Sequence, residues 1–201
     1  MMTSVKGIIN MTQIKLIVGL GNIGSQYEGT RHNAGQWFLE AVADKLNLTL
    51  TSDSKFHGAT AQTQIGAHKL WLLYPHTFMN KSGLAVSKLA QFYKIMPDEI
   101  LVAHDELDLP CGQIRLKKGG GHGGHNGLRD IDASIGTRDY HRLRIGIDHP
   151  GDRNKVVGYV LGKPSLEDKI AIDHSITRAI SHLGDIIQGN YQSVMNELHQ
   201  K

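Results

Sequence analysis

The sequence predicts an α/β fold, a single-domain three-layer sandwich in which helices flank a mixed, mostly parallel central sheet. Short apolar runs of strand length alternate along the chain with longer segments whose apolar residues recur at helical spacing. The chain has 201 residues, of which 40% are hydrophobic, and this is enough for one full core. No internal repeat or long linker divides it, so we expect one domain.

Five segments are predicted to be strands. Residues 14–18 (IKLIV) and 70–74 (LWLLY) are near-continuous apolar runs, which are typical of strands buried on both faces. Residues 100–103 form a third short apolar run. Residues 113–116 and 141–147 are expected to add two further strands.

Four segments are predicted to be helices. Residues 34–46 place apolar side chains at helical intervals, namely Trp37, Phe38, Ala41, Val42 and Leu46. Residues 81–93 and 128–135 are expected to form a longer and a shorter helix. Past Pro164, Ser165 with Asp168 resembles a capping box, which predicts a long helix through about residue 187.

The composition excludes several classes of protein. The one cysteine, Cys111, leaves no disulfide framework and no cysteine-based zinc site. The apolar runs are far too short to span a bilayer, and the N-terminus lacks the pattern of a secretory signal. We therefore expect a cytoplasmic protein that makes no membrane contact. Residues 1–10 show no periodicity and precede Met11, so we interpret them as an N-terminal extension, an upstream start or a remnant of cloning, ahead of a domain over residues 11–201.

Residues 119–127 (GGGHGGHNG) are so poor in side chains that they predict a loop rather than a stable helix or strand. Glycine lets a backbone approach a ligand closely, while His122, His125 and Asn126 supply hydrogen-bonding groups. A flexible hinge is the alternative, but serine would be its more usual companion. We interpret this glycine loop as a binding loop.

Basic charge is concentrated around the glycine loop. The formal charge of the chain is +3, but residues 112–155 contain nine Lys and Arg against five Asp and no Glu. Arg115, Lys117 and Lys118 lead into the loop, and Arg142 and Arg144 alternate along a predicted strand, which places both on one face. A one-sided basic patch beside a binding loop favours a phosphate-rich partner, although an ordinary solvated face has the same pattern.

Polar residues follow the predicted strands, and open α/β sheets bind ligands beyond the carboxyl ends of their strands. Four segments that follow predicted strands carry, in order, Asn22, Asn80, His104 with Asp105, and the glycine loop. We expect these four loops to converge on one crevice. His32 and Asn33 lie where the first loop enters its helix, so they can join the same rim.

Residues 19–24 (GLGNIG) form a competing motif, a G-x-G-x-x-G directly after a strand. Glu40 and Asp44 follow at about the distance of a ribose-binding acid, so this motif predicts an NAD(P)-binding oxidoreductase. Such a fingerprint requires a helix to start at once, because its N-terminal amides hold the pyrophosphate. Residues 25–31 have no apolar helical period, which disfavours the dinucleotide site.

Five segments of the chain together resemble the motifs of a known protein family. They are GLGNIGSQYEGTRHNAG (19–35), PHTFMNKSG (75–83), HDELDLP (104–110), GGGHGGHNGLRDI (119–131) and HRLRIGIDHPG (141–151). Together they resemble the bacterial peptidyl-tRNA hydrolase family, over a similarity that runs from about residue 12 to about residue 189. Ile23, Cys111 and Asp148 depart from the residues that relatives usually have.

The resemblance implies a monomeric α/β enzyme without a cofactor. Such an enzyme hydrolyses the ester between the C-terminus of a peptide and the 3′-terminal ribose of tRNA, and so recycles prematurely released peptidyl-tRNA. It contacts the acceptor end and the 3′ CCA of the tRNA. Two alternatives to the hydrolase stay open, namely the NAD(P)-binding oxidoreductase and a non-enzymatic RNA-binding module.

Ester hydrolysis at neutral pH needs a base that titrates near pH 7, a group that orients this base, and donors for the developing oxyanion. The resemblance places the family's catalytic histidine at His32 and its acidic partner at Asp105. A carboxylate that is hydrogen-bonded to an imidazole fixes the tautomer and stabilises the imidazolium. No G-x-S-x-G motif is present and Cys111 has no evident activating partner, so we expect direct attack by water.

The resemblance also identifies the substrate-binding asparagines, Asn22, Asn80 and Asn126, and a basic patch for tRNA phosphates, Arg115, Lys117 and Arg144. Tyr27, Phe78 and Met79 are further candidates to pack around the peptide or the terminal base, although buried aromatic and Met residues more often belong to the core. His125 is a candidate to assist Asn126 or the 3′ end. Asparagine amides can both donate to and accept from a peptide backbone of any sequence. Asp105, Glu106 and Asp108 with His104 could suggest a metal site, but His104 and Asp105 are neighbours at a strand end and should point apart, so we expect no metal.

Overall fold

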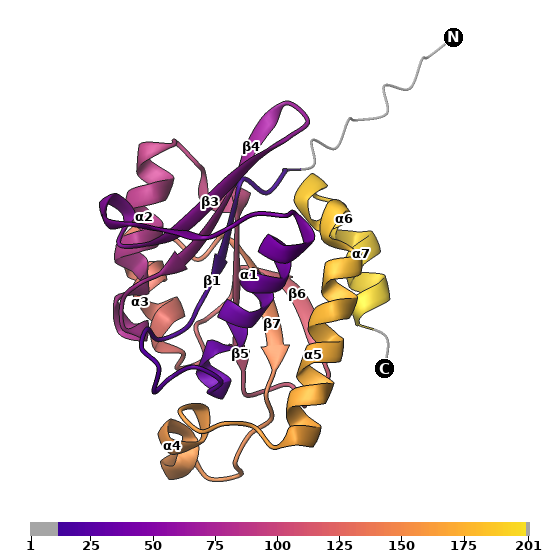
Figure 1. The fold of residues 1–201 in the computed structure, drawn as a ribbon. Coiled ribbons are helices and arrows are strands. Elements are labelled where there is room, and N and C mark those ends of the chain that lie inside the picture. Colours follow the sequence, from indigo (N-terminus) through magenta and orange to yellow (C-terminus); the bar gives the residue numbers. More distant parts are fainter. Residues whose placement is uncertain (1–11, 200–201) are drawn as a thin grey trace.

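Seven strands form one mixed sheet that lies between two layers of helices (Figure 1). The computed structural model describes residues 12–199, and the strand order across the sheet is β2-β3-β4-β1-β5-β7-β6. The predicted single-domain α/β sandwich is therefore confirmed. The extension expected over residues 1–10 lies outside the described residues and stays a prediction.

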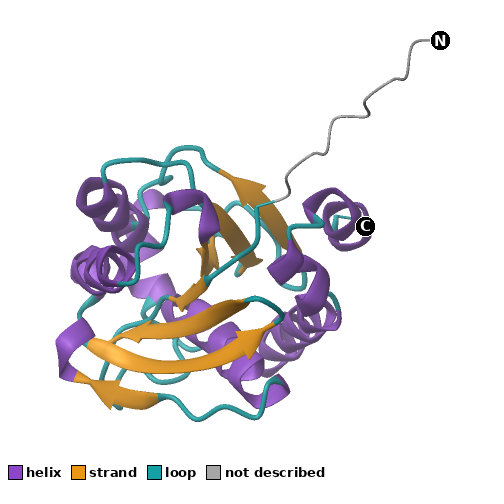
Figure 2. Ribbon diagram, turned by 90° about the horizontal axis from the view of Figure 1, so that it is seen from above, coloured by secondary structure: helices purple, strands orange, loops and turns teal. Residues whose placement is uncertain are grey.

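Four parallel strands make up the centre of the sheet. They are β1 (Leu16–Gly19), β4 (His68–Pro75), β5 (Ile100–Glu106) and β7 (His141–Gly146). The other strands are β2 (Thr51–Asp53) and β3 (Gly58–Ile65), which pair antiparallel, and β6 (Ile114–Lys118), which pairs antiparallel with β7. Seen from above, the strands lie between helices on both sides, which explains why the central strands are apolar runs (Figure 2).

The helices divide between the two faces of the sheet. One face is covered by α1 (Ala34–Lys45), α5 (Leu166–Ser181), α6 (Leu183–Gln188) and α7 (Tyr191–Leu198). The other face is covered by α2 (Ser82–Phe92) and α3 (Asn126–Ile135), while the short α4 (Val156–Val160) lies beside the carboxyl ends of the parallel strands (Figure 1). Among the described residues, no helix combines the length and the apolar character needed to cross a membrane.

The structure corrects several predicted elements. The long helix expected over residues 165–187 is two helices, α5 and α6, which meet at His182. Strand β5 extends to Glu106, so His104 and Asp105 lie in the strand and not in the loop after it. Strands β2 and β3 and helices α4 and α7 were not predicted, because β3 (GATAQTQI) has few bulky apolar residues and the two helices have only five and eight residues.

The glycine loop reaches the sheet edge by a route that the sequence did not predict. Because β6 runs antiparallel to β7, Lys118 pairs with His141, and the chain leaves the sheet at the edge opposite the carboxyl ends of the parallel strands. The loop then returns to bring His125 within 2.8 Å of Asp105. The loop thus follows an antiparallel strand, as β6 pairs with β7, and it still reaches the expected crevice.

Helix α1 packs so closely on the sheet that only glycine fits at the contact. A Cβ atom on Gly35 would lie 2.1 Å from the carbonyl oxygen of Ala103, and one on Gly19 would lie 2.5 Å from the carbonyl oxygen of Gly35. This contact holds the 3₁₀ turn η1 (Arg31–Asn33), which precedes α1, against the end of β5. The position of His32 is thereby fixed by the packing of α1.

We predict that Gly35→Ala lowers the free energy of unfolding by about 1–3 kcal/mol, because the added methyl group overpacks the contact between α1 and β5. Gly184→Ala is the matched control, since a Cβ atom there meets nothing within 4 Å, and it should be neutral or stabilising by up to about 1 kcal/mol. Urea unfolding curves of both variants measure the difference. Equal stability of the two variants would contradict the close packing of α1.

Candidate active site

A cavity of about 790 Å³ opens at the carboxyl ends of β1 and β5, between η1, the N-terminus of α3 and α4. Among the residues predicted for the site, the cavity is lined by Asn22, His32, Phe78, Met79, Asn80, Asp105, His125 and Asn126. The crevice expected from the ends of the strands therefore exists. A second recess, of about 420 Å³, lies over α3 and shares His122 and Arg129 with this cavity.

His32 and Asp105 form the polar centre of the cavity. The Nδ1 atom of His32 lies 3.0 Å from each carboxylate oxygen of Asp105, which is buried. A carboxylate partner makes Nδ1 the protonated nitrogen, so Nε2 keeps its lone pair. Burial disfavours the imidazolium form, but the charge of Asp105 and the hydrogen bond to it outweigh burial and raise the pKa of His32 above its ordinary value.

His125 holds the same carboxylate from the other side. Its Nε2 donates to Oδ1 of Asp105 at 2.8 Å, while its Nδ1 accepts from the backbone N–H of Leu128 and so caps α3. Burial alone would raise the pKa of Asp105, but His32 and His125 together lower it well below its usual range. Sequence reasoning assigned His125 to the substrate, whereas in the structure its two ring nitrogens contact the protein.

His104 lies beside this cluster but plays a different part. Its Nδ1 donates to the carbonyl oxygen of Asp105 at 2.7 Å, and its ring packs edge-on to His125 with centroids 5.1 Å apart. Burial, reinforced by His125, lowers the pKa of His104 to about 3, so the ring is neutral at physiological pH. The side chains of His104 and Asp105 belong to opposite faces of β5, which agrees with the argument that they do not share a metal.

Among residues 12–199, the side chains that come closest to a metal site are those of His32, Asp105 and His125, whose ligand atoms lie within 4.8 Å of one another. Hydrogen bonds account for this geometry. Because Nδ1 of His125 accepts from Leu128, its Nε2 carries a proton and cannot also offer a lone pair to a metal. The donor set therefore fits a hydrogen-bonded cluster better than a zinc site.

Asn22 is oriented by a network that sequence reasoning did not find. Its Oδ1 accepts from the backbone N–H of Met79 at 2.7 Å, and its backbone N–H and C=O both bond to the buried side chain of Asn33 at 2.9 and 3.0 Å. The hydroxyl of Tyr74 donates to the same Asn22 carbonyl. The side-chain amide of Asn22 thus keeps its Nδ2 donors for the cavity, and no described residue accepts from them. Asn33 was placed on the rim, but its position beside His32 did not reveal that it anchors Asn22.

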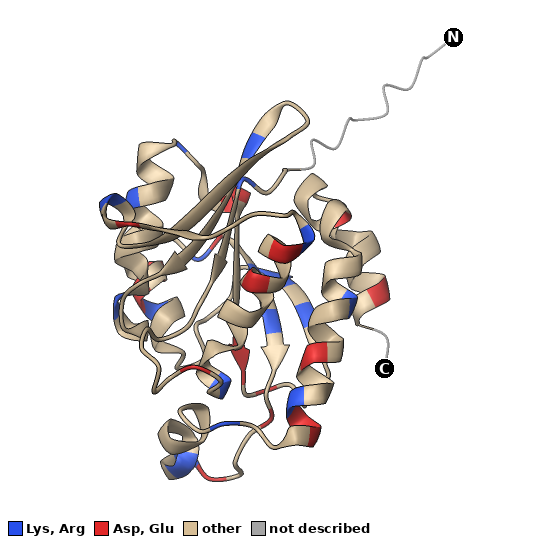
Figure 3. Cartoon of the chain, in the orientation of Figure 1, with Lys and Arg blue, Asp and Glu red and all other residues tan. Residues whose placement is uncertain are grey.

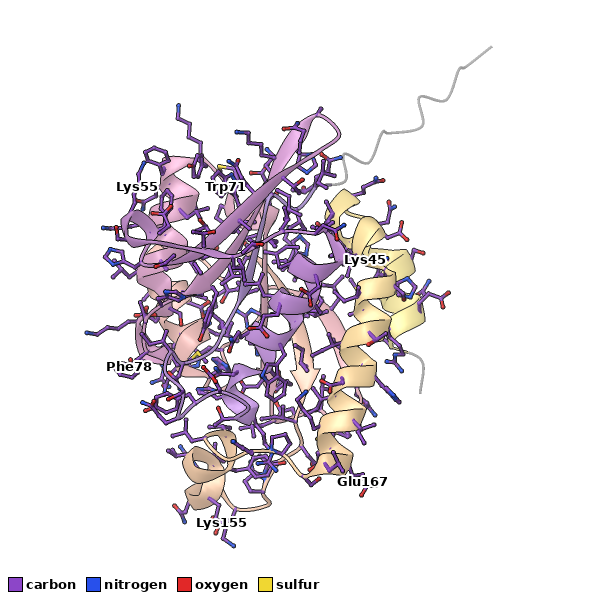
Figure 4. The ribbon with its side chains drawn as sticks, in the orientation of Figure 1. Lys45, Lys55, Trp71, Phe78, Lys155 and Glu167 are labelled. Carbon is purple, nitrogen blue, oxygen red and sulfur yellow. The ribbon has the colours of Figure 1, made fainter. Side chains whose placement is uncertain are left out.

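The remaining peptide-side candidates differ in exposure. Asn80 and Asn126 are exposed at the rim, in the turn η3 (Met79–Lys81) and in the first turn of α3. Phe78 is 56% exposed and lies at the surface (Figure 4). Its ring makes an edge-on contact with Tyr27. Met79 is 4% exposed and packs in the core, so only part of its surface reaches the cavity.

The basic residues lie on β6 and β7, where blue segments mark Lys and Arg (Figure 3). Lys117 is exposed, whereas Arg115 and Arg144 are half-buried and directly opposite each other in register, and Arg144 is bonded to Glu106 at 2.8 Å. Arg142 lies on the same face but is only 3% exposed. The expectation that Arg142 and Arg144 share an exposed basic face was therefore wrong for Arg142, because its guanidinium bonds inward to the glycine loop.

The structure does not support the dinucleotide site. Residues 25–29 form turns after Gly24, and α1 begins only at Ala34, so no helix N-terminus follows the G-x-G-x-x-G motif directly.

Cys111 lies outside the cavity lining, and burial raises its pKa to about 11, so it is not an activated nucleophile.

Comparison with known proteins agrees with the geometry. The family model described as Peptidyl-tRNA hydrolase matches residues 16–201. The chain is 55% identical over 188 residues to the peptidyl-tRNA hydrolase of Neisseria meningitidis serogroup C, covering 94% of this chain and 98% of that one. It is also 55% identical over 186 residues to that of Coxiella burnetii, covering 92% and 97%.

Solved structures give the same result. The crystal structure of peptidyl-tRNA hydrolase from Acinetobacter baumannii superposes with a TM-score of 0.90 at 52% sequence identity, covering 94% of this chain and 95% of that one. The near-complete coverage confirms the resemblance seen in the five sequence segments. The chain belongs to the peptidyl-tRNA hydrolase family.

Proposed function

We propose that the chain hydrolyses the ester bond between a peptide and the 3′-terminal ribose of tRNA, using a water molecule that His32 activates. The observation that carries the proposal is the contact of His32 Nδ1 with both oxygens of the buried Asp105, which leaves Nε2 as the free ring nitrogen beside the cavity. A base of this kind needs no covalent intermediate. Release of an N-acetyl amino acid from N-acetylaminoacyl-tRNA tests the activity directly.

The reaction balances with one base. As water attacks the ester carbonyl carbon, its proton moves to Nε2 of His32 and its oxygen forms the new C–O bond. The imidazolium is stabilised by Asp105, which stays ionised. Collapse of the tetrahedral intermediate breaks the bond to the ribose oxygen, and His32 returns its proton to that oxygen. The products are a tRNA with a free 3′ hydroxyl and a peptide carboxylic acid, which releases its remaining proton to solvent and becomes a carboxylate.

Asn22 is the candidate donor to the developing oxyanion or to the peptide carbonyl. Because its Oδ1 is occupied by the N–H of Met79, only its Nδ2 protons face the cavity, so it donates and does not accept. Its backbone is held by Asn33, which limits reorganisation during the reaction. Asn80 and Asn126 are free to meet the peptide backbone, and Phe78 with Tyr27 supports an apolar contact at the rim.

The tRNA would bind along the basic residues. Arg115, Lys117 and Arg144 lie close together on β6 and β7, and phosphate contacts from such a patch supply affinity rather than base recognition. We infer that the patch holds the acceptor end while the 3′ CCA enters the cavity. We further infer that the enzyme acts as a monomer in the cytoplasm, where its substrate arises, and needs no metal or other cofactor.

We predict that His32→Ala lowers kcat by about 10²–10⁴-fold on N-acetylaminoacyl-tRNA while tRNA binding is largely retained. Wild-type activity should fall as the pH drops through the raised pKa of His32, because the base must be neutral. In Asp105→Asn the charge that stabilises the imidazolium is lost. The maximal kcat at high pH should therefore fall, and the acid limb of the pH–rate profile should move to lower pH. His174→Ala, which changes an exposed histidine on α5, is the control and should alter neither kcat nor the pH–rate profile. Near-normal turnover by His32→Ala would remove His32 from the mechanism.

We predict that Lys117→Ala raises KM for tRNA substrates and leaves kcat nearly unchanged, because it removes a phosphate contact. The slope of log kcat/KM against log salt concentration should become shallower by about 1. Lys45→Ala, at the end of α1, removes the same charge from another part of the molecule and serves as the control. An equal loss by Lys117→Ala on a small N-acyl ester would instead indicate damage to the chemistry or the fold.

We predict that Asn80→Ala narrows the preference for blocked substrates. An unblocked aminoacyl-tRNA lacks the acyl carbonyl that an exposed asparagine amide can meet, and its α-amino group, with a pKa of about 7.7–8.0, is often charged. The variant should therefore lose more kcat/KM on N-acetylaminoacyl-tRNA than on aminoacyl-tRNA, by about tenfold if one hydrogen bond is lost. Asn196→Ala on α7 controls for surface effects. Equal losses on both substrates would reassign Asn80 to water positioning or to the scaffold.

A further inference from the structure

Arg142 is a buried cation that the proposed mechanism does not use. Its side chain is 3% exposed, and its guanidinium lies 4.8 Å from the ring centre of Tyr140 and 3.5 Å from Oδ1 of Asp132. A buried charge is costly unless it is paired and hydrogen-bonded, so a position of this kind indicates a specific task. Its two short hydrogen bonds show what that task is.

Both short bonds go to consecutive carbonyl groups of the glycine loop. Nη1 donates to the carbonyl oxygen of Gly121 at 2.7 Å, and Nη2 donates to that of Gly120 at 2.8 Å. The planar fork of arginine matches two acceptors held side by side, whereas the point charge of lysine does not. Arg142 therefore grips the backbone of the loop.

The loop has little else to hold it. Gly119, Gly120, Gly123 and Gly124 all have positive φ, which few other residues adopt without strain. Two further hydrogen bonds lie within the loop: the N–H of His125 donates to the carbonyl of His122, and the N–H of Gly124 donates to the ring of His122. Apart from these, the hydrogen bonds that described residues make to residues 120–124 come from Arg142. Arg142 on β7 thus supplies the hydrogen bonds that hold this segment from outside, while the Lys117 side chain on β6 packs beside Gly120.

The far end of the loop delivers His125 to Asp105. His125 follows Gly121 by four residues, and its Nε2 lies 2.8 Å from Asp105 Oδ1. We propose that Arg142 is a positioning residue for the hydrolysis: by holding the carbonyls of Gly120 and Gly121 it sets His125 against Asp105, and so sets the orientation of His32. The inference rests on the proposed function, in which Asp105 and His32 activate water.

The test compares Arg142→Lys with Arg138→Lys, using N-acetylaminoacyl-tRNA as substrate. Arg138 is the matched control, because its Nε lies 3.4 Å from the same Asp132 carboxylate, but its side chain is exposed and forms no hydrogen bond with the loop among the residues that the structure describes. Arg142→Lys keeps the positive charge but loses the planar pair of N–H donors that binds the two carbonyls. Its kcat should fall by about 10–100-fold with KM changed less than twofold, since a displacement of about 1 Å in a catalytic group has effects of this size. Arg138→Lys should retain wild-type kcat.

A double-mutant cycle separates positioning from general support of the fold. In the His125→Ala background, Arg142→Lys should cost less than twofold in kcat, because the group through which it acts is absent. A full additional loss in that background, or a wild-type kcat in folded Arg142→Lys, would overturn the proposal. If thermal unfolding shows that Arg142→Lys is not folded, Arg142→Gln replaces it, since it removes the buried charge and keeps one amide donor.

The same assay distinguishes failure of the proposed function from failure of the role of Arg142. Failure of the wild type to release N-acetyl amino acid would refute the proposed function itself, and full activity in His32→Ala would refute the activation of water by His32. An inactive His32→Ala together with an unimpaired Arg142→Lys would refute only the role of Arg142.

Discussion

The buried carboxylate of Asp105 accepts hydrogen bonds from His32 and His125, and the arrangement of the whole site depends on this shared acceptor. Its two donors come from the turn before α1 and from the cap of α3, on opposite sides of the sheet. The lowered pKa of Asp105 links the site to stability, because the ionised form favours folding above the unfolded-state value of about 3.8 and this contribution is lost as the pH falls through the folded pKa. The raised pKa of His32 has the opposite sign, so its contribution is present at low pH and is lost as the pH rises through that pKa.

Each donor is positioned by a contact that excludes alternatives. The turn carrying His32 is fixed because Gly35 brings α1 against the carbonyl of Ala103. The loop carrying His125 is held by Arg142, which donates to two carbonyls that accept no other hydrogen bond from a described residue outside the loop. The apolar sheet thus provides a rigid base, while a polar network between a few residues sets the geometry of the site. This division suits hydrolysis by water, which requires preorganised donors and a base rather than a nucleophilic side chain.

The sequence predicted the sandwich because the short apolar runs at residues 70–74 and 100–103 are typical of buried strands, and it predicted a crevice because polar residues follow these strands. It could not predict β3, whose partly polar surface lacks a strong strand pattern, nor the direction of β6, which only pairing with β7 reveals. The burial of Arg142 was missed for the same reason, since alternation along a strand gives the face of a residue but not what covers that face. The family resemblance supplied the residues of the site, while the tautomer of His125 and the anchoring of Asn22 by Asn33 depend on tertiary contacts.

The central claim is that Asp105 fixes the tautomer of His32 and raises its pKa. A ¹⁵N NMR titration of the His32 imidazole in the wild type and in Asp105→Asn tests it most directly. In the wild type we expect the pKa of His32 to lie above 6.5 and the proton of the neutral ring to be on Nδ1. In Asp105→Asn we expect a lower pKa of His32 and a mixed population of tautomers. The same pKa and the same tautomer in both proteins would contradict it.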